Sequence, residues 1–421
     1  MSYARKVITK VLPSGARLFA TPFSSRNMVS IVGSVVGGSR RAGSDEFANI
    51  HAHMLMEGTI KHGKREIQEA LDNIGAGLSF SHSSDRLHFA AYARPKNAPK
   101  LLSLLAEILT DATFPARELN VLKKREAANL TFAAQDTRTQ ASIALSRLLY
   151  PTGHPNHAET TDESLRALGH ITSKKLAAYH ARTLDQSSLI LSVAGDITPE
   201  HAFALARTYF KRLPIQPTEL PSLAQSAPGT AEKVAIPIEN KESIDYLIGI
   251  ATGIAQDHPD YPALAIGMNI LGYQGFLSRL MKTVREKEGL TYGVYGNMSG
   301  FSRRYDGALS VWANFAPQMF EKGRTSIMRE IKKIVTRGVT ANELRTHASM
   351  FLARRKIALS TSSAYASLAH GLAADDLSLS YPDALQRKIE KLTVEQVNAV
   401  LKKYLVPKLM SEASAGAVQG L

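Results

Sequence analysis

The chain is 421 residues long and 44% hydrophobic, which leaves room for two or three domains. Its net charge is +14, but the basic residues are scattered in pairs and form no basic arm, so we expect no nucleic-acid partner. The absence of cysteine excludes disulfides, thiol catalysis and thiolate metal sites. No apolar run approaches the roughly 18–20 residues of a membrane span, and no signal core follows the N-terminus. We therefore expect no membrane partner and a cytoplasmic protein, with the periplasm or an organelle as alternatives.

The first half of the chain mixes strand and helix patterns without a simple alternation. β-Branched residues predict a strand at 29–36, and apolar residues at helical spacing predict a helix over 45–57 that Ser44 caps. Gly58 is expected to end this helix in the left-handed conformation. Further strands are predicted at 6–12, from 16, at 77–81, 86–93 and 188–194, and further helices at 64–74, 98–110, 118–149, 173–181 and 199–210.

A proline-rich stretch at 214–233 has the composition of a linker, and the order of elements recurs after it. The recurring elements are strands at 244–251, 291–298 and 308–314 and helices at 261–271, 320–335 and from 343. Self-similarity at a spacing of about 220 residues indicates a duplicated domain. We predict an α+β protein with an N-terminal domain at 1–213 and a C-terminal domain at 234–421. Each is expected to be an α/β sandwich, a mostly antiparallel sheet with helices packed on one face.

The helix at 45–57 carries a segment with a recognisable motif. Residues 49–59 read NIHAHMLMEGT, and Asn49 and His53 are expected on the helix face away from the core, with Ala52 between them. This segment resembles the metal-binding helix of the pitrilysin/insulinase-type zinc peptidases, the inverzincins, whose motif is H-x-x-E-H. The resemblance covers nearly the whole chain and is better at 33–59, 185–213 and 266–296. It implies two homologous α+β halves that face each other like a clamshell.

The resemblance places the zinc ligands of the family on residues that are unsuited to the role. In the motif, two histidines bind zinc and the glutamate activates water. Here the first histidine position is Asn49, the glutamate position is Ala52, and only the second histidine is present, as His53. The third ligand position falls on Asn129, or on Thr131 in a second alignment. The resemblance therefore implies a degenerate motif, no metal or other cofactor in this chain, and zinc in a partner subunit.

A second segment of the resemblance lies at 77–81. It corresponds to the edge strand with which the family holds substrate by backbone pairing. The usual Asn-Ala pair of this strand is Ser79-Phe80 here, so these two residues are expected to bind substrate. The larger side chain of Phe80 is expected to crowd the cleft. An ordinary edge strand is the structural alternative.

The second half of the chain preserves more of the family pattern. A glycine-containing loop carries Gly272 and Gly275, which the resemblance implies as substrate-binding residues. An R-x-x-x-G-L-x-Y segment then runs from Arg285 to Tyr292. In the family, this Arg and Tyr bind the substrate backbone and stabilise the oxyanion that forms when water attacks, a role that suits two hydrogen-bond donors. A surface arginine and a core tyrosine are the structural alternative.

Some members of the family work as pairs in which one subunit carries the zinc motif and the other lends the Arg and Tyr. The sequence therefore predicts a non-catalytic subunit of a heterodimeric zinc metallopeptidase, inactive alone, that acts on peptides with a homologous zinc-binding subunit. Three alternatives are a scaffold or core subunit of a larger assembly, a peptide-binding clamshell without peptidase activity, and an independent peptidase with rearranged ligands.

Overall fold

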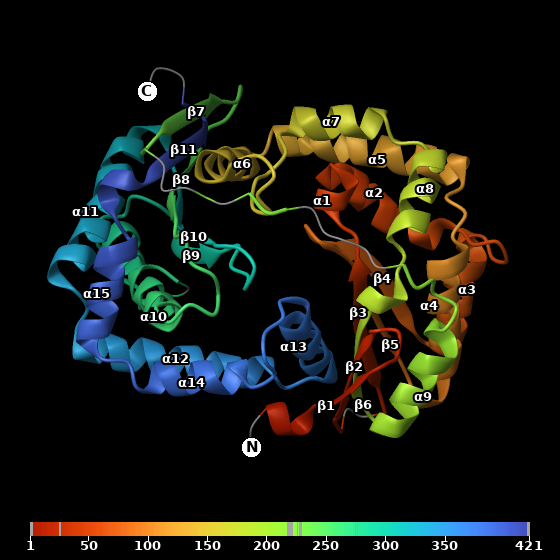
Figure 1. Ribbon diagram of the computed structural model, residues 1–421. Coiled ribbons are helices and arrows are strands. Elements are labelled where there is room, and N and C mark those ends of the chain that lie inside the picture. Colours follow the sequence, from red (N-terminus) through yellow and green to blue (C-terminus); the bar gives the residue numbers. More distant parts are fainter. Residues whose placement is uncertain are drawn as a thin grey trace. The chain divides into compact units, whose positions relative to one another are not determined.

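The computed structural model describes residues 3–24, 27–216, 222–224, 226, 230–273, 275 and 277–418. The chain forms two compact units, each built on one β-sheet (Figure 1). Unit 1 comprises Met1–Leu130, Thr161–Ser222 and Lys356–Asp383, and unit 2 comprises Thr131–Thr160, Leu223–Arg355 and Ala384–Leu421. Within the described ranges, no helix is both long and apolar enough to cross a membrane.

The sheet of unit 1 has six strands in the order β1-β2-β6-β3-β5-β4. Their bounds are Ile8–Val11 (β1), Arg17–Pro22 (β2), Val29–Val36 (β3), Gly77–His82 (β4), Arg86–Ala93 (β5) and Ile190–Gly195 (β6). β2 and β6 are parallel, and every other neighbouring pair is antiparallel. β4 lies at one edge of this sheet and pairs with β5.

Helices cover both faces of the sheet of unit 1. They are α1 (Ser39–Ala42), α2 (Asp45–Met54), α3 (Lys64–Ile74), α4 (Ala98–Asp111), the first part of α5 (Ala116–Ala134), α7 (Thr161–Gly169), α8 (Ser173–Thr183), α9 (Pro199–Phe210) and α13 (Ser362–Ala374). Because successive strand residues point to opposite faces, Leu18 packs into the cluster that includes residues of α2, α4 and α9, whereas Phe19 packs with Ala366 and Ala369 of α13.

Unit 2 repeats this plan with five strands in the order β7-β11-β8-β10-β9. Their bounds are Lys233–Pro237 (β7), Ile244–Ala251 (β8), Val294–Ser299 (β9), Ala308–Phe315 (β10) and Ser411–Gly416 (β11). β7 and β11 are parallel and the other pairs are antiparallel. The strand order and directions match those of β2 to β6, so the edge strands β4 and β9 hold equivalent positions, and the predicted duplication is confirmed.

Helices of unit 2 also lie on both faces of its sheet (Figure 1). They are α6 (Thr137–Leu149), α10 (Tyr261–Leu271), α11 (Phe320–Arg337), most of α12 (Ala341–Ala358), most of α14 (Tyr381–Glu390) and α15 (Val394–Tyr404). Ala141 and Leu145 of α6 pack against Leu247 of β8 and Ala413 of β11. We call α13 in unit 1 and α6 in unit 2 the covering helices.

The covering helices are exchanged with respect to the sequence. α6 follows the elements of unit 1 along the chain but packs on the sheet of unit 2, and α13 follows elements of unit 2 but packs on the sheet of unit 1. The predicted fold class, two homologous α+β halves, is confirmed, and the structure adds one covering helix on the second face of each sheet. The linker predicted at 214–233 lies partly outside the described residues, at 217–221, 225 and 227–229.

Several local predictions need correction. The helical region predicted at 118–149 is two helices, because the carboxylate of Asp136 accepts the N–H of Thr139 at 2.7 Å and starts α6. Gly58 does not close α2 in the left-handed conformation: a 3-10 turn follows the helix, and Gly58 has φ 158° and ψ 149°. Strand β11 was not predicted, because its sequence SEASAG has no β-branched or aromatic residue.

Candidate functional site

Helix α2, which carries the degenerate motif, is held in unit 1 by its cap and its core face. The hydroxyl of Ser44 accepts the N–H of Phe47 at 3.3 Å, as predicted from the sequence. Ile50 and Met54 are fully buried in the apolar cluster. Packing and capping therefore position this helix.

The motif positions provide little for a metal ion to bind. His53 is exposed, and its ring Nδ1–H donates to the backbone carbonyl of Asn49 at 3.0 Å, so this nitrogen is used within one helical turn. On α5, the amide of Asn129 donates to the carboxylate of Glu126 at 3.1 Å. In the part of the chain that the structure describes, no three His, Asp or Glu side chains are grouped so as to hold a metal ion.

Ala52 does not share the outward face of α2 with Asn49 and His53, contrary to the expectation from the sequence. It is fully buried in the apolar cluster of unit 1. The reason is helical geometry: residue 52 lies one turn from Ala48 and Leu55, and both of these are buried. The position at which the family has its glutamate is therefore part of the core in this chain.

A buried histidine pair lies behind α2. Nε2 of His51 lies 3.0 Å from Nδ1 of His180, and Nε2 of His180 donates to the carbonyl of Leu109 at 2.7 Å. Because Nε2 of His180 carries the proton, its Nδ1 accepts from His51 and both rings are neutral. Burial lowers the pKa of both, and the neighbouring His180 lowers that of His51 further. The core position of His51 was predicted, but its partner, 129 residues away, was not.

The edge strand β4 places the two predicted substrate-binding residues differently. Ser79 is exposed, whereas the side chain of Phe80 is 7% exposed and packs edge-on against Phe89 in the core. The expectation that Phe80 crowds a cleft is therefore wrong, because successive residues of a strand point to opposite faces and Phe80 points inward. Only its backbone is placed to contact a ligand along the strand edge.

Arg285 and Tyr292 flank a short segment of unit 2 that joins a helix to β9. Arg285 lies in the last turn of a π-helical segment, Met281–Lys287, and is partly exposed. π-Helical segments are rare in proteins as a whole, but those that occur are often found at functional sites. The side chain of Tyr292 is 94% exposed, so it is not the core tyrosine of the structural alternative.

The glycine loop contacts the edge of β9. The carbonyl of Gly272 accepts the N–H of Gly296 at 2.9 Å, so this part of the β9 edge is already paired within unit 2. A Cβ at Gly272 would lie 2.4 Å from the backbone nitrogen of Gly296, and the approach therefore requires glycine. Gly275 has φ +91° and lies against the groove of unit 2 described next. Gln274 and Phe276 lie outside the described residues.

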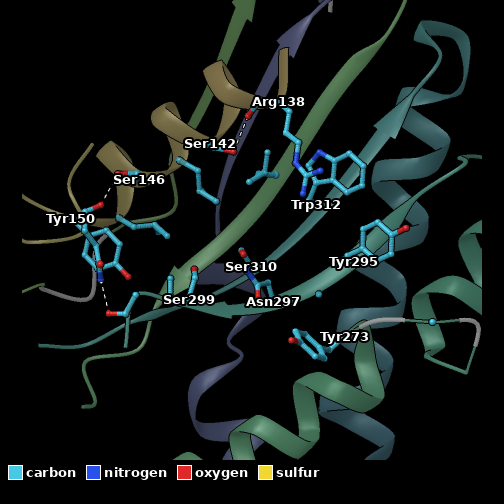
Figure 2. Close-up of a pocket in the computed structure, with 18 residues that line it drawn as sticks. Arg138, Ser142, Ser146, Tyr150, Tyr273, Tyr295, Asn297, Ser299, Ser310 and Trp312 are labelled. Carbon is cyan, nitrogen blue, oxygen red and sulfur yellow. Dashed lines mark hydrogen bonds between the residues drawn. The ribbon is translucent and has the colours of Figure 1, made fainter. Parts of the chain in front are cut away.

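Each unit has a groove on the face of its sheet that the covering helix lies on. The groove of unit 1 has a volume of about 810 Å³, and Ser79 and Tyr92 are among the residues that line it. The groove of unit 2 has a volume of about 860 Å³ and contains Arg138, Tyr295 and Trp312 (Figure 2). Both volumes fall within the range of ligand pockets. Sequence reasoning missed the second groove, although Trp312, the single tryptophan of the chain, stands in an alternating strand pattern.

These observations define a two-unit α+β protein on a metallopeptidase plan, in which the motif helix is retained and its ligands are replaced. The chain belongs to peptidase family M16. The family model for insulinase (peptidase family M16) matches residues 20–156, and the family model for the peptidase M16 inactive domain matches residues 170–351.

Three similar proteins agree with this assignment. An uncharacterized zinc protease of Mycobacterium bovis is 25% identical over 412 residues, which cover 94% of this chain and 90% of the relative. A non-peptidase homologue of Helicobacter pylori is 22% identical over 360 residues, which cover 85% of this chain and 81% of the relative. The crystal structure of a peptidase M16 inactive domain from Pseudomonas fluorescens has a TM-score of 0.88 at 27% identity and covers 97% of both chains. The family and fold predicted from the sequence are confirmed.

Proposed function

We propose that this chain is the non-catalytic subunit of a heterodimeric zinc metallopeptidase, to which it supplies Arg285 and Tyr292. The observation that carries the proposal is the 94% exposure of Tyr292. Large exposed aromatic side chains are enriched where proteins bind partners and ligands. In this chain the exposed tyrosine lies seven residues after an arginine, in the order that the family uses for substrate binding.

The segment between the two residues is anchored to the rest of unit 2. The hydroxyl of Thr291 donates to the carbonyl of Asn314 and accepts the N–H of Gly293 at 3.1 Å. The carboxylate of Glu288 accepts the hydroxyl proton of Ser326 at 2.6 Å and pairs with Arg329. Donors on an anchored segment need little reorganisation when charge develops on a substrate, which supports a role in oxyanion stabilisation.

The division of labour follows from the residues at the motif positions. Ala52 cannot take a proton from water, and Asn49 and Asn129 are poor zinc ligands, so the activated water has to come from a zinc-binding partner. The guanidinium of Arg285 and the phenol of Tyr292 would then donate hydrogen bonds to the substrate backbone and to the oxyanion.

The experiment is a peptidase assay of the chain alone, of a homologue with an intact H-x-x-E-H motif alone, and of the two together. Activity is expected only in the mixture. Because the loss of one oxyanion donor typically lowers kcat about 100-fold or more, Arg285→Ala and Tyr292→Phe should each lower kcat of the mixture by about that factor. Tyr292→Phe removes one hydroxyl from an exposed ring, so the fold should be unchanged.

Arg337→Ala is the matched control, because Arg337 is an exposed arginine at the end of α11 in the same unit. Mixtures with this variant should keep full activity. Full activity of the mixtures that contain Arg285→Ala and Tyr292→Phe would refute the proposal. A stable complex that shows no peptidase activity would favour the scaffold alternative instead.

A further inference from the structure

The groove of unit 2 is an elongated surface with strand residues as its floor and a helix as its wall (Figure 2). Tyr295, Asn297 and Ser299 alternate along β9 and face the groove, and Ser310 and Trp312 of β10 stand directly opposite Asn297 and Tyr295. At about 3.3 Å per residue, the row from Tyr295 to Ser299 spans roughly 13 Å. Helix α6 forms the wall. The groove therefore suits an extended chain better than a compact molecule.

One end of the groove is a three-layer stack. The indole N–H of Trp312 donates to the carboxylate of Asp245 at 2.5 Å, which fixes the ring. The guanidinium carbon of Arg138 lies 4.1 Å from the centroid of the Trp312 ring, and Tyr295 stacks with the ring at 5.5 Å and an interplanar angle of 3°. Cation–π contact holds the guanidinium at a defined place at the end of the groove.

Arg138 is the only charged side chain among the described residues that line this groove. Within the part of the chain that the structure describes, its guanidinium makes no hydrogen bond or ion pair, and its stacking on Trp312 leaves the N–H groups at the ring edge. The nearby carboxylate of Asp136 caps α6 through the N–H of Thr139, and its pKa is lowered mainly by hydrogen bonds with Thr139 and in part by the charge of Arg138. A planar guanidinium with uncommitted N–H groups matches the geometry of a carboxylate.

The floor of the groove offers neutral hydrogen-bonding groups. In the described part of the chain, the side chains of Asn297, Ser299 and Ser310 have no hydrogen-bond partner. Together they offer donors and acceptors of the kind that peptide amides require. The backbone edge of β9 is paired with Gly272 at Gly296, so a ligand here would be bound by these side chains rather than by strand addition.

We propose that the groove of unit 2 binds an extended peptide segment whose carboxylate is held by Arg138 and whose backbone amides lie along Asn297, Ser299 and Ser310. The carboxylate comes either from an Asp or Glu side chain or from the C-terminus of the peptide. The net charge of +14 favours the approach of such acidic ligands. This inference goes beyond the proposed function, because it concerns binding by this chain alone and needs no catalytic partner.

The test uses the intrinsic fluorescence of Trp312, which is the only tryptophan of the chain and stands in the groove. The full chain is titrated with three heptapeptides of one neutral sequence of alanine, serine and phenylalanine. The first has blocked ends and one glutamate, the second has glutamine in that place, and the third is the glutamine peptide with a free C-terminal carboxylate. We expect saturable changes in emission with the first, the third or both, which identifies the source of the carboxylate.

The blocked glutamine peptide should bind at least tenfold more weakly, because it lacks the charge-assisted pair. Arg138→Gln should lower the affinity for the carboxylate peptides at least tenfold, and Arg138→Lys, which keeps the charge but not the planar fork, should lower it less. Arg138 is exposed, so these variants should fold, and thermal unfolding verifies this. Arg337→Gln, with the same change of charge elsewhere in unit 2, should bind as the unchanged chain does.

Four results would overturn the inference. Equal affinities for the three peptides, or unchanged binding by Arg138→Gln, would remove the role of the carboxylate. The absence of any saturable change would remove the site itself. Acetate or benzoate binding as tightly as the peptides would show a site for small acids and would remove the role of the extended floor.

Discussion

The two units share one strand order, but they differ in the features that they retain. In unit 1 the motif helix α2 is retained for packing, and the position of the family's glutamate, Ala52, is in the core. In unit 2 the edge strand β9, which is equivalent to β4 of unit 1, is paired at Gly296 with the glycine loop. The groove beside β9 carries the stack of Arg138, Trp312 and Tyr295. A duplicated fold can therefore replace the metal ligands of one copy without losing its core, while the other copy presents a groove with charged and aromatic side chains.

The units also differ in how many of their histidines have a lowered pKa. Burial lowers the pKa of His51 and His180 behind α2, of His88 to about 4 and of His370 to about 3, and all four lie in unit 1. In unit 2, burial lowers the pKa of His347, and the charge of the nearby Glu343 partly offsets this decrease. The hydroxyl of Ser34 lies 2.7 Å from Nε2 of His370. Unit 1 therefore depends more strongly on histidines that stay uncharged.

The largest expected effect is the greater acid sensitivity of unit 1. Each of these four histidines, of which His88 is half-buried and the others are buried, is neutral in the folded chain and takes up a proton on unfolding below its ordinary pKa of 6.5. Their contribution to stability is therefore complete above pH 6.5 and is lost as the pH falls toward the folded pKa, by up to about 1.4 kcal/mol per pH unit for each.

Hydrogen exchange followed by mass spectrometry measures this difference strand by strand. Between about pH 7.5 and about pH 5.5, after correction for the intrinsic exchange rate, protection should fall more in β3 and β6 than in the equivalent strands β8 and β11. An equal loss of protection in both sheets would contradict the prediction and would show that the units unfold as one.

The next effect concerns the attempt to rebuild the zinc motif in unit 1. Ala52→Glu should lower the free energy of unfolding by about 3–5 kcal/mol, because it buries a carboxylate without a partner in a packed core. His53→Glu introduces the same side chain one residue later on the exposed face and should change stability by no more than about 1 kcal/mol. Urea unfolding measures both. A stable Ala52→Glu chain would mean that position 52 faces solvent or a polar partner.

Elements with a strong local signal were predictable from the sequence. The strand predicted at 29–36 is β3, and the strand predicted at 244–251 is β8, because both are rich in β-branched and apolar residues and are central in their sheets. Gly75 ends α3 in the left-handed conformation, φ 59° and ψ 41°, as a glycine after an amphipathic helix indicates. The resemblance placed the motif helix correctly for the same reason, since its cap and core pattern are local.

What could not be predicted depends on contacts between distant residues. The pattern of α6 shows that it has an apolar face but not which sheet that face covers, so the exchange of the covering helices was missed. The stack of Arg138 on Trp312 joins residues from α6 and β10, and no spacing in the sequence links them. The inward direction of Phe80 was missed because the alternation of β4 was not followed residue by residue.

The smallest expected effect distinguishes two reasons why a position requires glycine, and each unit provides one example. In unit 2, Gly272→Ala should lower the free energy of unfolding by about 1–3 kcal/mol, because the added Cβ would lie 2.4 Å from the backbone of Gly296 and 2.7 Å from Leu280. In unit 1, a Cβ at Gly75 meets no atom within 4 Å, but φ is +59°. Gly75→Ala should therefore lower stability by only about 1 kcal/mol, through backbone strain alone.

Asparagine distinguishes these two causes, because it tolerates the left-handed conformation but is larger than alanine. Gly75→Asn should recover part of the stability lost in Gly75→Ala, whereas Gly272→Asn should be less stable than Gly272→Ala. The emission of Trp312 provides a second measurement, since Tyr295 stacks on Trp312 and precedes Gly296. Gly272→Ala should shift this emission and Gly75→Ala should not. If Gly272→Ala were fully stable with unchanged emission, the glycine loop would not be needed to close the edge of β9, and the difference between the two edge strands would disappear.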